Sequence, residues 1–164
     1  MLSVPARVEL EFGPSLDVVS VVRRFVGDFY GRVLDEDLTS RMALATHELL
    51  ENAIKYSTRG ETRLSIRVEP PASGARVSIQ TSNRATSENL RLVADAIEAM
   101  KRSQDPFAYY QEAMRRSARR SEGSGLGLAR VRAEAEMSLE CDISDERLTL
   151  TARCVGEGGA GDAS

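Results

Sequence analysis

The sequence predicts an α+β fold, a two-layer α/β sandwich in which helices cover one face of a mixed, largely antiparallel sheet. Three observations support this fold class. Short stretches alternate apolar and polar residues, longer stretches place apolar residues at helical spacing, and the expected strands come in pairs that helices separate. With 164 residues the chain has the length of one domain, which we assign to residues 1–155, followed by a disordered tail at 156–164.

The first third of the chain is expected to contain one strand and two helices. Residues 7–12 alternate apolar and polar side chains, which predicts a strand. Gly13-Pro14-Ser15 interrupts that pattern, and Pro14 suits the first turn of a helix that ends near Val33. Asp37 is an N-cap candidate for a second helix, over residues 37–56, whose apolar residues recur at helical spacing.

The middle of the chain predicts two strands and then an interrupted helix. Alternation predicts strands over residues 64–68 and 77–80, and residues 70–74 between them form turns readily. From Thr86 to about Ser117 the pattern is helical again. We expect Pro106 to break this helix, because proline lacks the backbone donor that a helix interior requires.

The last third predicts a glycine-rich loop, a helix and a hairpin. The loop covers residues 121–127 and leads into a short helix over residues 126–137. A turn at Asp145-Glu146 would then pair two strands whose apolar residues share one face. The expected partners are Leu139 with Ala152, Cys141 with Leu150, and Ile143 with Leu148.

Charge is concentrated in one part of the chain. Residues 115–132 contain six arginines and one glutamate, a formal charge of +5. Since the whole chain carries a net charge of −3, the remaining residues carry −8. The basic stretch has no interleaved aromatic residues and the rest of the chain is acidic. We therefore expect no nucleic-acid partner.

The sequence also bears on the cellular compartment. In the expected hairpin Cys154 lies opposite Met137 and away from Cys141, so we expect no disulfide and reduced thiols. No apolar segment approaches the roughly 18 residues needed to span a bilayer, and the first residues do not resemble a signal peptide. We expect a cytoplasmic protein with no membrane partner.

One polar stripe lies on the helix predicted for residues 37–56. At 100° per residue, Glu48, Asn52 and Lys55 project from one side, at the margin of the apolar stripe. An amide oxygen suits Mg²⁺ and a carboxylate can accept a proton from a nucleophile. The alternative interpretation is an ordinary solvated helix face, since polar residues four apart are common on helices.

A second candidate region is the glycine loop. Gly123, Gly125 and Gly127 precede a helix, and closely spaced glycines let backbone N–H groups approach an anion at a helix N-terminus. Neighbouring arginines, including Arg119 and Arg120, favour a phosphate ligand. A flexible linker beside an exposed basic helix would produce the same pattern.

Together these segments resemble the GHKL ATPases, a family that includes histidine kinases, gyrase-type ATPases and anti-sigma-factor serine kinases. The run from Glu48 to Tyr56 resembles the family's N box. Gly123-x-Gly125-Leu126-Gly127-Leu128 resembles its G2 box and follows in the expected order. The resemblance runs from about Leu38 to Cys154 and implies the Bergerat type of sandwich.

The resemblance implies ATP and Mg²⁺ as cofactors. Asn52 would hold Mg²⁺, and Glu48 would activate the attacking hydroxyl or water. The glycine loop, with Gly123, Gly125, Leu126 and Gly127, would cover the phosphates. By the same resemblance Lys55, Arg119 and Arg120 would lie near them.

One motif of the family is missing. Its G1 box, Asp-x-Gly-x-Gly, normally follows the strand that we expect to end at Gln80, and its aspartate contacts the adenine amino group. Here the segment is Thr81-Ser82-Asn83-Arg84-Ala85-Thr86, with neither aspartate nor glycine. Asn83 is the expected replacement, with a weaker acceptor than a carboxylate.

Length and histidine content indicate the branch of the family. The single histidine, His47, lies inside the N box, so the chain is not a complete histidine kinase. The resemblance favours a partner-switching serine/threonine kinase, similar to the SiaB-type subgroup, that phosphorylates a small regulatory protein and could form a homodimer. The alternative is a degenerate, non-catalytic module of the same fold that binds and regulates a partner without nucleotide.

Overall fold

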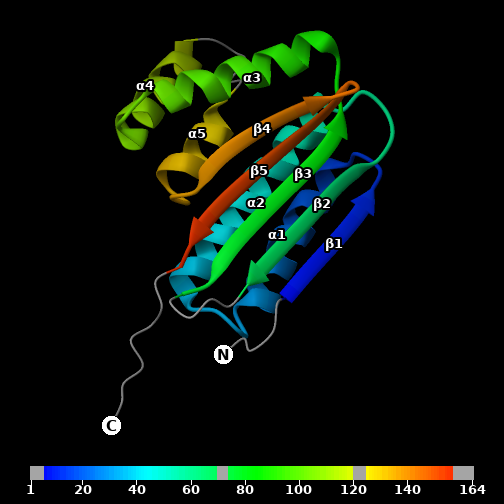
Figure 1. Cartoon of the computed structure of the whole chain (residues 1–164), viewed down its shortest axis with the longest axis vertical. Coiled ribbons are helices and arrows are strands. Elements are labelled where there is room, and N and C mark those ends of the chain that lie inside the picture. Colours follow the sequence, from blue (N-terminus) through cyan, green and yellow to red (C-terminus); the bar gives the residue numbers. More distant parts are fainter. Residues whose placement is uncertain (1–5, 70–73, 120–124, 157–164) are drawn as a thin grey trace.

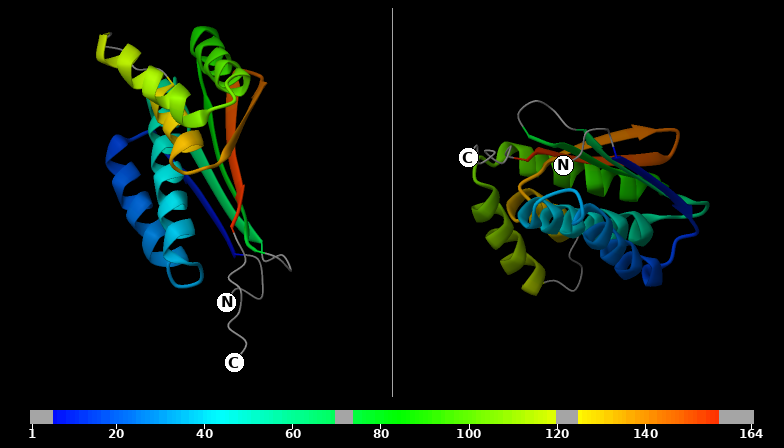
Figure 2. Two further views of the ribbon diagram at one scale, coloured as in Figure 1. Left: turned by 90° about the vertical axis from the view of Figure 1, so that its left-hand side faces the viewer. Right: turned by 90° about the horizontal axis from the view of Figure 1, so that it is seen from below.

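A computed structural model describes residues 6–69, 74–119 and 125–156. It has two layers: helices cover one face of a five-stranded sheet, and the other face is open (Figures 1 and 2). This confirms the predicted fold class. The elements are β1 (Ala6–Phe12), α1 (Leu16–Tyr30), α2 (Glu36–Tyr56), β2 (Thr62–Glu69), β3 (Arg76–Arg84), α3 (Ser87–Arg102), α4 (Pro106–Arg119), α5 (Leu126–Ala133), β4 (Ser138–Ser144) and β5 (Arg147–Val155).

The strands lie in the order β1-β2-β3-β5-β4, and every pairing between them is antiparallel. The expectation of a mixed sheet was therefore wrong within the described residues. β5 follows α3, α4, α5 and β4 in the sequence, yet it lies beside β3 in the sheet (Figure 1). The three helices between β3 and β4 are thus brought to the same end of the sandwich as the C-terminal part of α2.

The β4–β5 hairpin confirms the predicted register. Leu139 pairs with Ala152, Cys141 with Leu150, and Ile143 with Leu148. At the turn, Asp145 has φ 50° and Glu146 has φ 64°, the left-handed values that a two-residue hairpin of type I′ requires. Both cysteines are free, as expected.

The ends of three helices differ from the prediction. α2 is capped by Asp35, whose Oδ1 accepts the Leu38 N–H at 2.8 Å, so Asp37 lies in the first turn and is not the cap. α1 ends at Tyr30, short of Val33, and a hydrogen-bonded turn follows it. α5 ends at Ala133, because Glu136 adopts φ 52° and cannot continue a helix.

The interruption expected at Pro106 is present, because α3 ends before it and α4 begins with it. Proline is well tolerated at this first helical position, where its missing N–H has no helical partner. Asp105 caps the helix: its Oδ1 accepts the N–H groups of Phe107 and Ala108 at 3.0 and 3.1 Å.

β3 is longer than predicted. It continues past Gln80 to Arg84, and residues 81–84 all pair with β5, up to Arg84 opposite Arg147. The segment that stands in place of the missing glycine box is therefore strand and not loop. Polar residues hid this extension, because Thr81-Ser82-Asn83-Arg84 has no apolar alternation.

The core lies between the two layers. Along β2 the burial alternates at each residue, so one side chain faces the helices and the next faces the open side of the sheet. Each large apolar side chain that is fully buried contributes about 1.5–3 kcal/mol. The largest fully buried apolar side chains include Met42, Leu49, Leu50, Leu64, Ile66, Ile79, Ile97, Met100, Leu128 and Leu148.

Two further predictions concerned a membrane-spanning segment and the C-terminal tail. No helix among the described residues is long and apolar enough to cross a membrane. The tail predicted from residue 156 onward lies, except for Gly156 itself, outside the described residues.

The hairpin turn yields a stability prediction. Glu146→Gly should raise the free energy of unfolding by about 1 kcal/mol, since glycine adopts positive φ without the penalty that a Cβ brings. The exposed Glu146–Arg84 ion pair, with a separation of 3.9 Å, contributes little against this. The matched control is Asp142→Gly on β4, where glycine should cost stability. Urea unfolding measures both, and an equal loss in the two variants would contradict the prediction.

Candidate functional site

A cavity of about 330 Å³ lies where α2, α4 and α5 meet. It is formed by segments that are far apart in the sequence and that the order of strands brings to one end of the sandwich (Figure 1). Its lining residues are Glu48, Glu51, Asn52, Lys55 and Tyr56 from α2, Tyr110 from α4, and Gly125, Leu126, Gly127 and Arg130 at and within α5.

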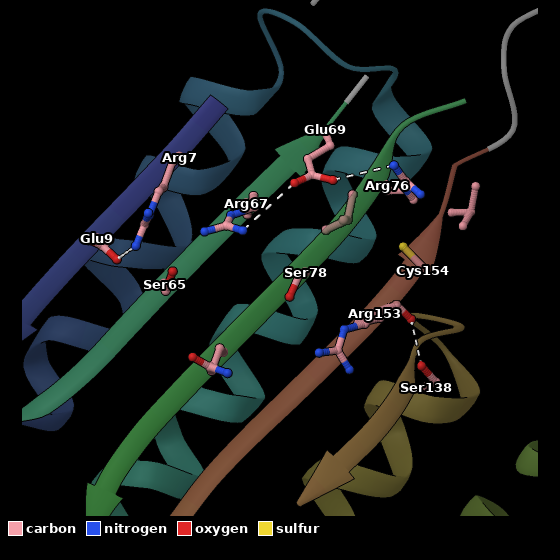
Figure 3. A pocket seen from close by; sticks show the side chains of 13 residues that line it. Arg7, Glu9, Ser65, Arg67, Glu69, Arg76, Ser78, Ser138, Arg153 and Cys154 are labelled. Atoms are coloured by element: carbon pink, nitrogen blue, oxygen red, sulfur yellow. Dashed lines mark hydrogen bonds and ion pairs between the residues drawn. The ribbon is translucent and has the colours of Figure 1, made fainter. Parts of the chain in front are cut away.

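A larger hollow, of about 690 Å³, lies on the open face of the sheet (Figure 3). Its charged side chains are occupied mainly with one another: Arg7 pairs with Glu9, and Glu69 lies between Arg67 and Arg76. This is the pattern of a solvated antiparallel sheet face. We therefore place the candidate site in the smaller cavity, where the chemical groups converge.

Glu48 is the most buried carboxylate of the cavity, with 10% of its side chain exposed. Its Oε1 accepts a hydrogen bond from Arg130 Nη1 at 3.1 Å, and Arg130 Nε donates to Glu134 Oε2 at 2.8 Å. The hydrogen bond to Glu134, foremost among several influences, raises the pKa of Arg130. One guanidinium thus holds two carboxylates and joins α5 to α2.

Asn52 lies one turn beyond Glu48 on α2 and also lines the cavity. Its Oδ1 is buried and has no hydrogen-bond partner among the described residues. A buried acceptor without a donor costs about 1–3 kcal/mol, so such groups usually bind water or an ion. An amide oxygen beside a carboxylate is a suitable donor set for Mg²⁺.

The glycines at the start of α5 explain how closely this helix approaches α2. Gly125 is the N-cap residue and has φ 88°. At Gly127 a Cβ atom would lie only 2.4 Å from Glu48 Oε2, so no other residue fits there without displacing the carboxylate. The first N–H groups of α5 have no helical partners. They lie at the cavity wall, where they could donate hydrogen bonds to an anion.

Other predicted site residues lie at varying distances from this cavity. Lys55 lines it, with its ammonium 5.4 Å from the centre of the Tyr56 ring. Arg119 is exposed at the end of α4 and is not part of the lining. Arg120 and Gly123 lie outside the described residues.

Asn83 lies apart from the cavity lining. It belongs to β3, is only 1% exposed, and its Nδ2 donates to the Arg84 carbonyl at 3.2 Å. The structure therefore brings Glu48, Asn52, Lys55 and the start of α5 together, and it does not bring Asn83 to them.

Four lining residues were not among the predicted site residues, namely Glu51, Tyr56, Tyr110 and Arg130. Arg130 belongs to the basic stretch, but its partner Glu48 is 82 positions away and only its i,i+4 relation to Glu134 was visible. Tyr110 comes from α4, and nothing in the sequence distinguished it. Burial raises the pKa of Tyr110 and the charge of Glu134 raises it further, so its phenol is protonated at neutral pH.

Comparison with known proteins shows a family and a fold. The family model described as histidine kinase-, DNA gyrase B-, and HSP90-like ATPase matches residues 38–159. Among solved structures, a chain of the SiaB-SiaC complex from Pseudomonas aeruginosa matches with a TM-score of 0.59 and 14% identity, over 89% of each chain. At that identity the likeness shows the fold alone. None of the curated proteins matches.

The contact between Gly127 and Glu48 can be tested through stability. Gly127→Ala should lower the free energy of unfolding by about 1–3 kcal/mol, since Glu48 or α5 must shift. The matched control is Gly27→Ala in α1, where a Cβ would meet nothing within 4 Å. That change should raise stability by roughly 0.5–1 kcal/mol.

A double-mutant cycle identifies the cause. In a Glu48→Ala background the cost of Gly127→Ala should largely disappear, because the carboxylate that the new methyl group meets is gone. Chemical unfolding of the four proteins measures the coupling. The same cost in both backgrounds would show that Glu48 is not what restricts position 127.

Proposed function

Because the chain belongs to the family of histidine kinase-, DNA gyrase B- and HSP90-like ATPases, we propose that it is a magnesium- and ATP-dependent protein kinase. It would transfer the terminal phosphoryl group to a serine or threonine of a small regulatory protein, as in partner-switching systems. The observation that favours this most is the buried Asn52 Oδ1. It has no hydrogen-bond partner among the described residues and lies in the cavity that Glu48 and the start of α5 also line.

The residues of the cavity fit the cation and the phosphates. Asn52 would hold Mg²⁺, and the first N–H groups of α5 with Lys55 would hold phosphate oxygens. When bound, the metal ion would supply neutralisation of the negative charge that phosphoryl transfer redistributes. The protein itself then has mainly to position the reacting groups.

Glu48 would accept the proton of the attacking hydroxyl. Arg130 binds Oε1, while Oε2 is the atom nearest to Gly127, so the carboxylate is held in one orientation between α2 and α5. A positioned base of this kind contributes typically 10²–10⁴-fold to a rate. Arg130 is in this proposal a positioning residue, because it acts through Glu48.

The comparison supports a protein as the partner. The solved structure with the same fold is described as a complex of SiaB with SiaC, so a surface of this fold can bind a second protein. We therefore propose a small protein as substrate. The free thiols of Cys141 and Cys154 are compatible with the reducing cytoplasm, where such systems operate.

A second candidate function is a non-catalytic module that binds its partner without nucleotide. It is favoured by the ion pair between Glu48 and Arg130, which already occupies the carboxylate, and by the burial of Asn83 in β3. In this case the fold and the partner surface would be retained while the cavity has no ligand.

Two substitutions separate binding from transfer. Asn52→Ala should weaken magnesium-ATP binding at least about tenfold, because a charge-assisted contact of about 1.5–3 kcal/mol is lost. Glu48→Gln should leave binding within a few-fold and reduce transfer about 10²–10⁴-fold. Titration calorimetry measures binding, and phosphorylation of the isolated partner measures transfer.

The control is Asn89→Ala on α3, which removes an asparagine outside the cavity lining and should change neither quantity. Absence of any heat with millimolar magnesium-ATP would count against the kinase. A partner complex that forms equally with and without nucleotide, and equally with Asn52→Ala, would support the non-catalytic module instead.

A further inference from the structure

The chain is closed at the place where the resemblance expects the nucleotide base. There the end of β3 is bonded to the segments on both sides of it. The Ala85 N–H donates to the Glu146 carbonyl and the Thr58 N–H donates to the Arg84 carbonyl, each at 3.0 Å. Asn83 and Ala85 are 1% and 3% exposed. At this exposure a ligand reaches the two side chains only if the side chains packed over them move.

The cavity that is open has a different chemical character. Its lining comes from α2, α4 and the start of α5, and among these described residues none belongs to β3. The lining offers two carboxylates and one amide, which suit a metal ion. It also offers two cationic side chains and the N-terminus of α5, which suit phosphates. At about 330 Å³ it is at the lower end of the roughly 300–1,000 Å³ typical of ligand sites.

We propose that this site binds the triphosphate and its magnesium ion and does not select the base. The inference rests on the proposed function, since it specifies the ligand of the same cavity. The base lies outside the buried part of the site. The aromatic residues of the lining are Tyr56 and Tyr110, and an aromatic ring stacks on any base.

The physical reason is that no residue of β3 is among the described residues that line the cavity, so β3 offers the base edge no hydrogen-bonding partner there. A site built to bond a ligand's polar group rejects an analogue lacking it by about 10⁴–10⁵-fold, whereas a site without such a bond discriminates little. Asn83 is the side chain that could distinguish an amino group from a carbonyl, but it is only 1% exposed, and its Nδ2 donates to the Arg84 carbonyl.

The experiment is titration calorimetry of the wild-type chain with magnesium complexes of ATP, GTP and inorganic tripolyphosphate. We expect Kd values for ATP and GTP within about threefold of each other, and tripolyphosphate within about tenfold of both. Asn52→Ala should weaken all three by a similar factor. Asn83→Ala, if thermal unfolding shows it folded, should leave the ATP-to-GTP ratio unchanged.

The outcomes distinguish the two proposals. ATP binding more than tenfold tighter than GTP, or a loss of ATP preference on Asn83→Ala, would overturn the inference and leave the kinase proposal intact. Failure of all three ligands to bind at millimolar concentration would overturn the proposed function and the inference with it. The wild-type comparison is decisive even where the Asn83 variant fails to fold.

Discussion

The contact of α5 with α2 is the interaction on which the candidate site depends. Gly127 lets the helices approach until Glu48 Oε2 leaves no space for a Cβ, and Arg130 binds the same carboxylate from the next turn. This contact places the N-terminus of α5 beside Asn52 and leaves a cavity between the helices. It also buries Leu128 at the next position, so the hydrophobic core and the site are anchored by the same short helix.

The site lies among the helices because only one face of the sheet is covered (Figure 2). Alternation along the strands sends apolar residues toward the helices and polar ones to the open face, where charged side chains pair across strands. Those exposed pairs contribute little to stability individually. The covered face holds the core, so a cavity with converging functional groups arises among the helices and not on the open face.

The hairpin register was predictable because a shift by one residue would turn every apolar side chain of a strand to the wrong face. The stripe of Glu48, Asn52 and Lys55 was predictable from helical periodicity, and all three line the cavity. The extension of β3 was not, since strand pairing with β5 outweighed the polar sequence of residues 81–84. The Glu48–Arg130 pair was also beyond prediction, because only the folded chain brings residues 82 positions apart together.

The two asparagines that sequence analysis placed in one site are in opposite physical states. Asn83 is buried and its Nδ2 donates to the Arg84 carbonyl, so the donor side of its amide is satisfied without a ligand. Asn52 Oδ1 is buried without a partner. Among the described residues, the other side-chain atoms in that state are hydroxyls and the His47 Nδ1, none of which lines the cavity. Burying this Asn52 oxygen without a partner costs about 1–3 kcal/mol, a cost that an apolar residue at position 52 would avoid. A ligand bound to Asn52 Oδ1 would offset the same cost. Asn83 is not among the residues with such an atom, so the two asparagines differ in what they require of a ligand.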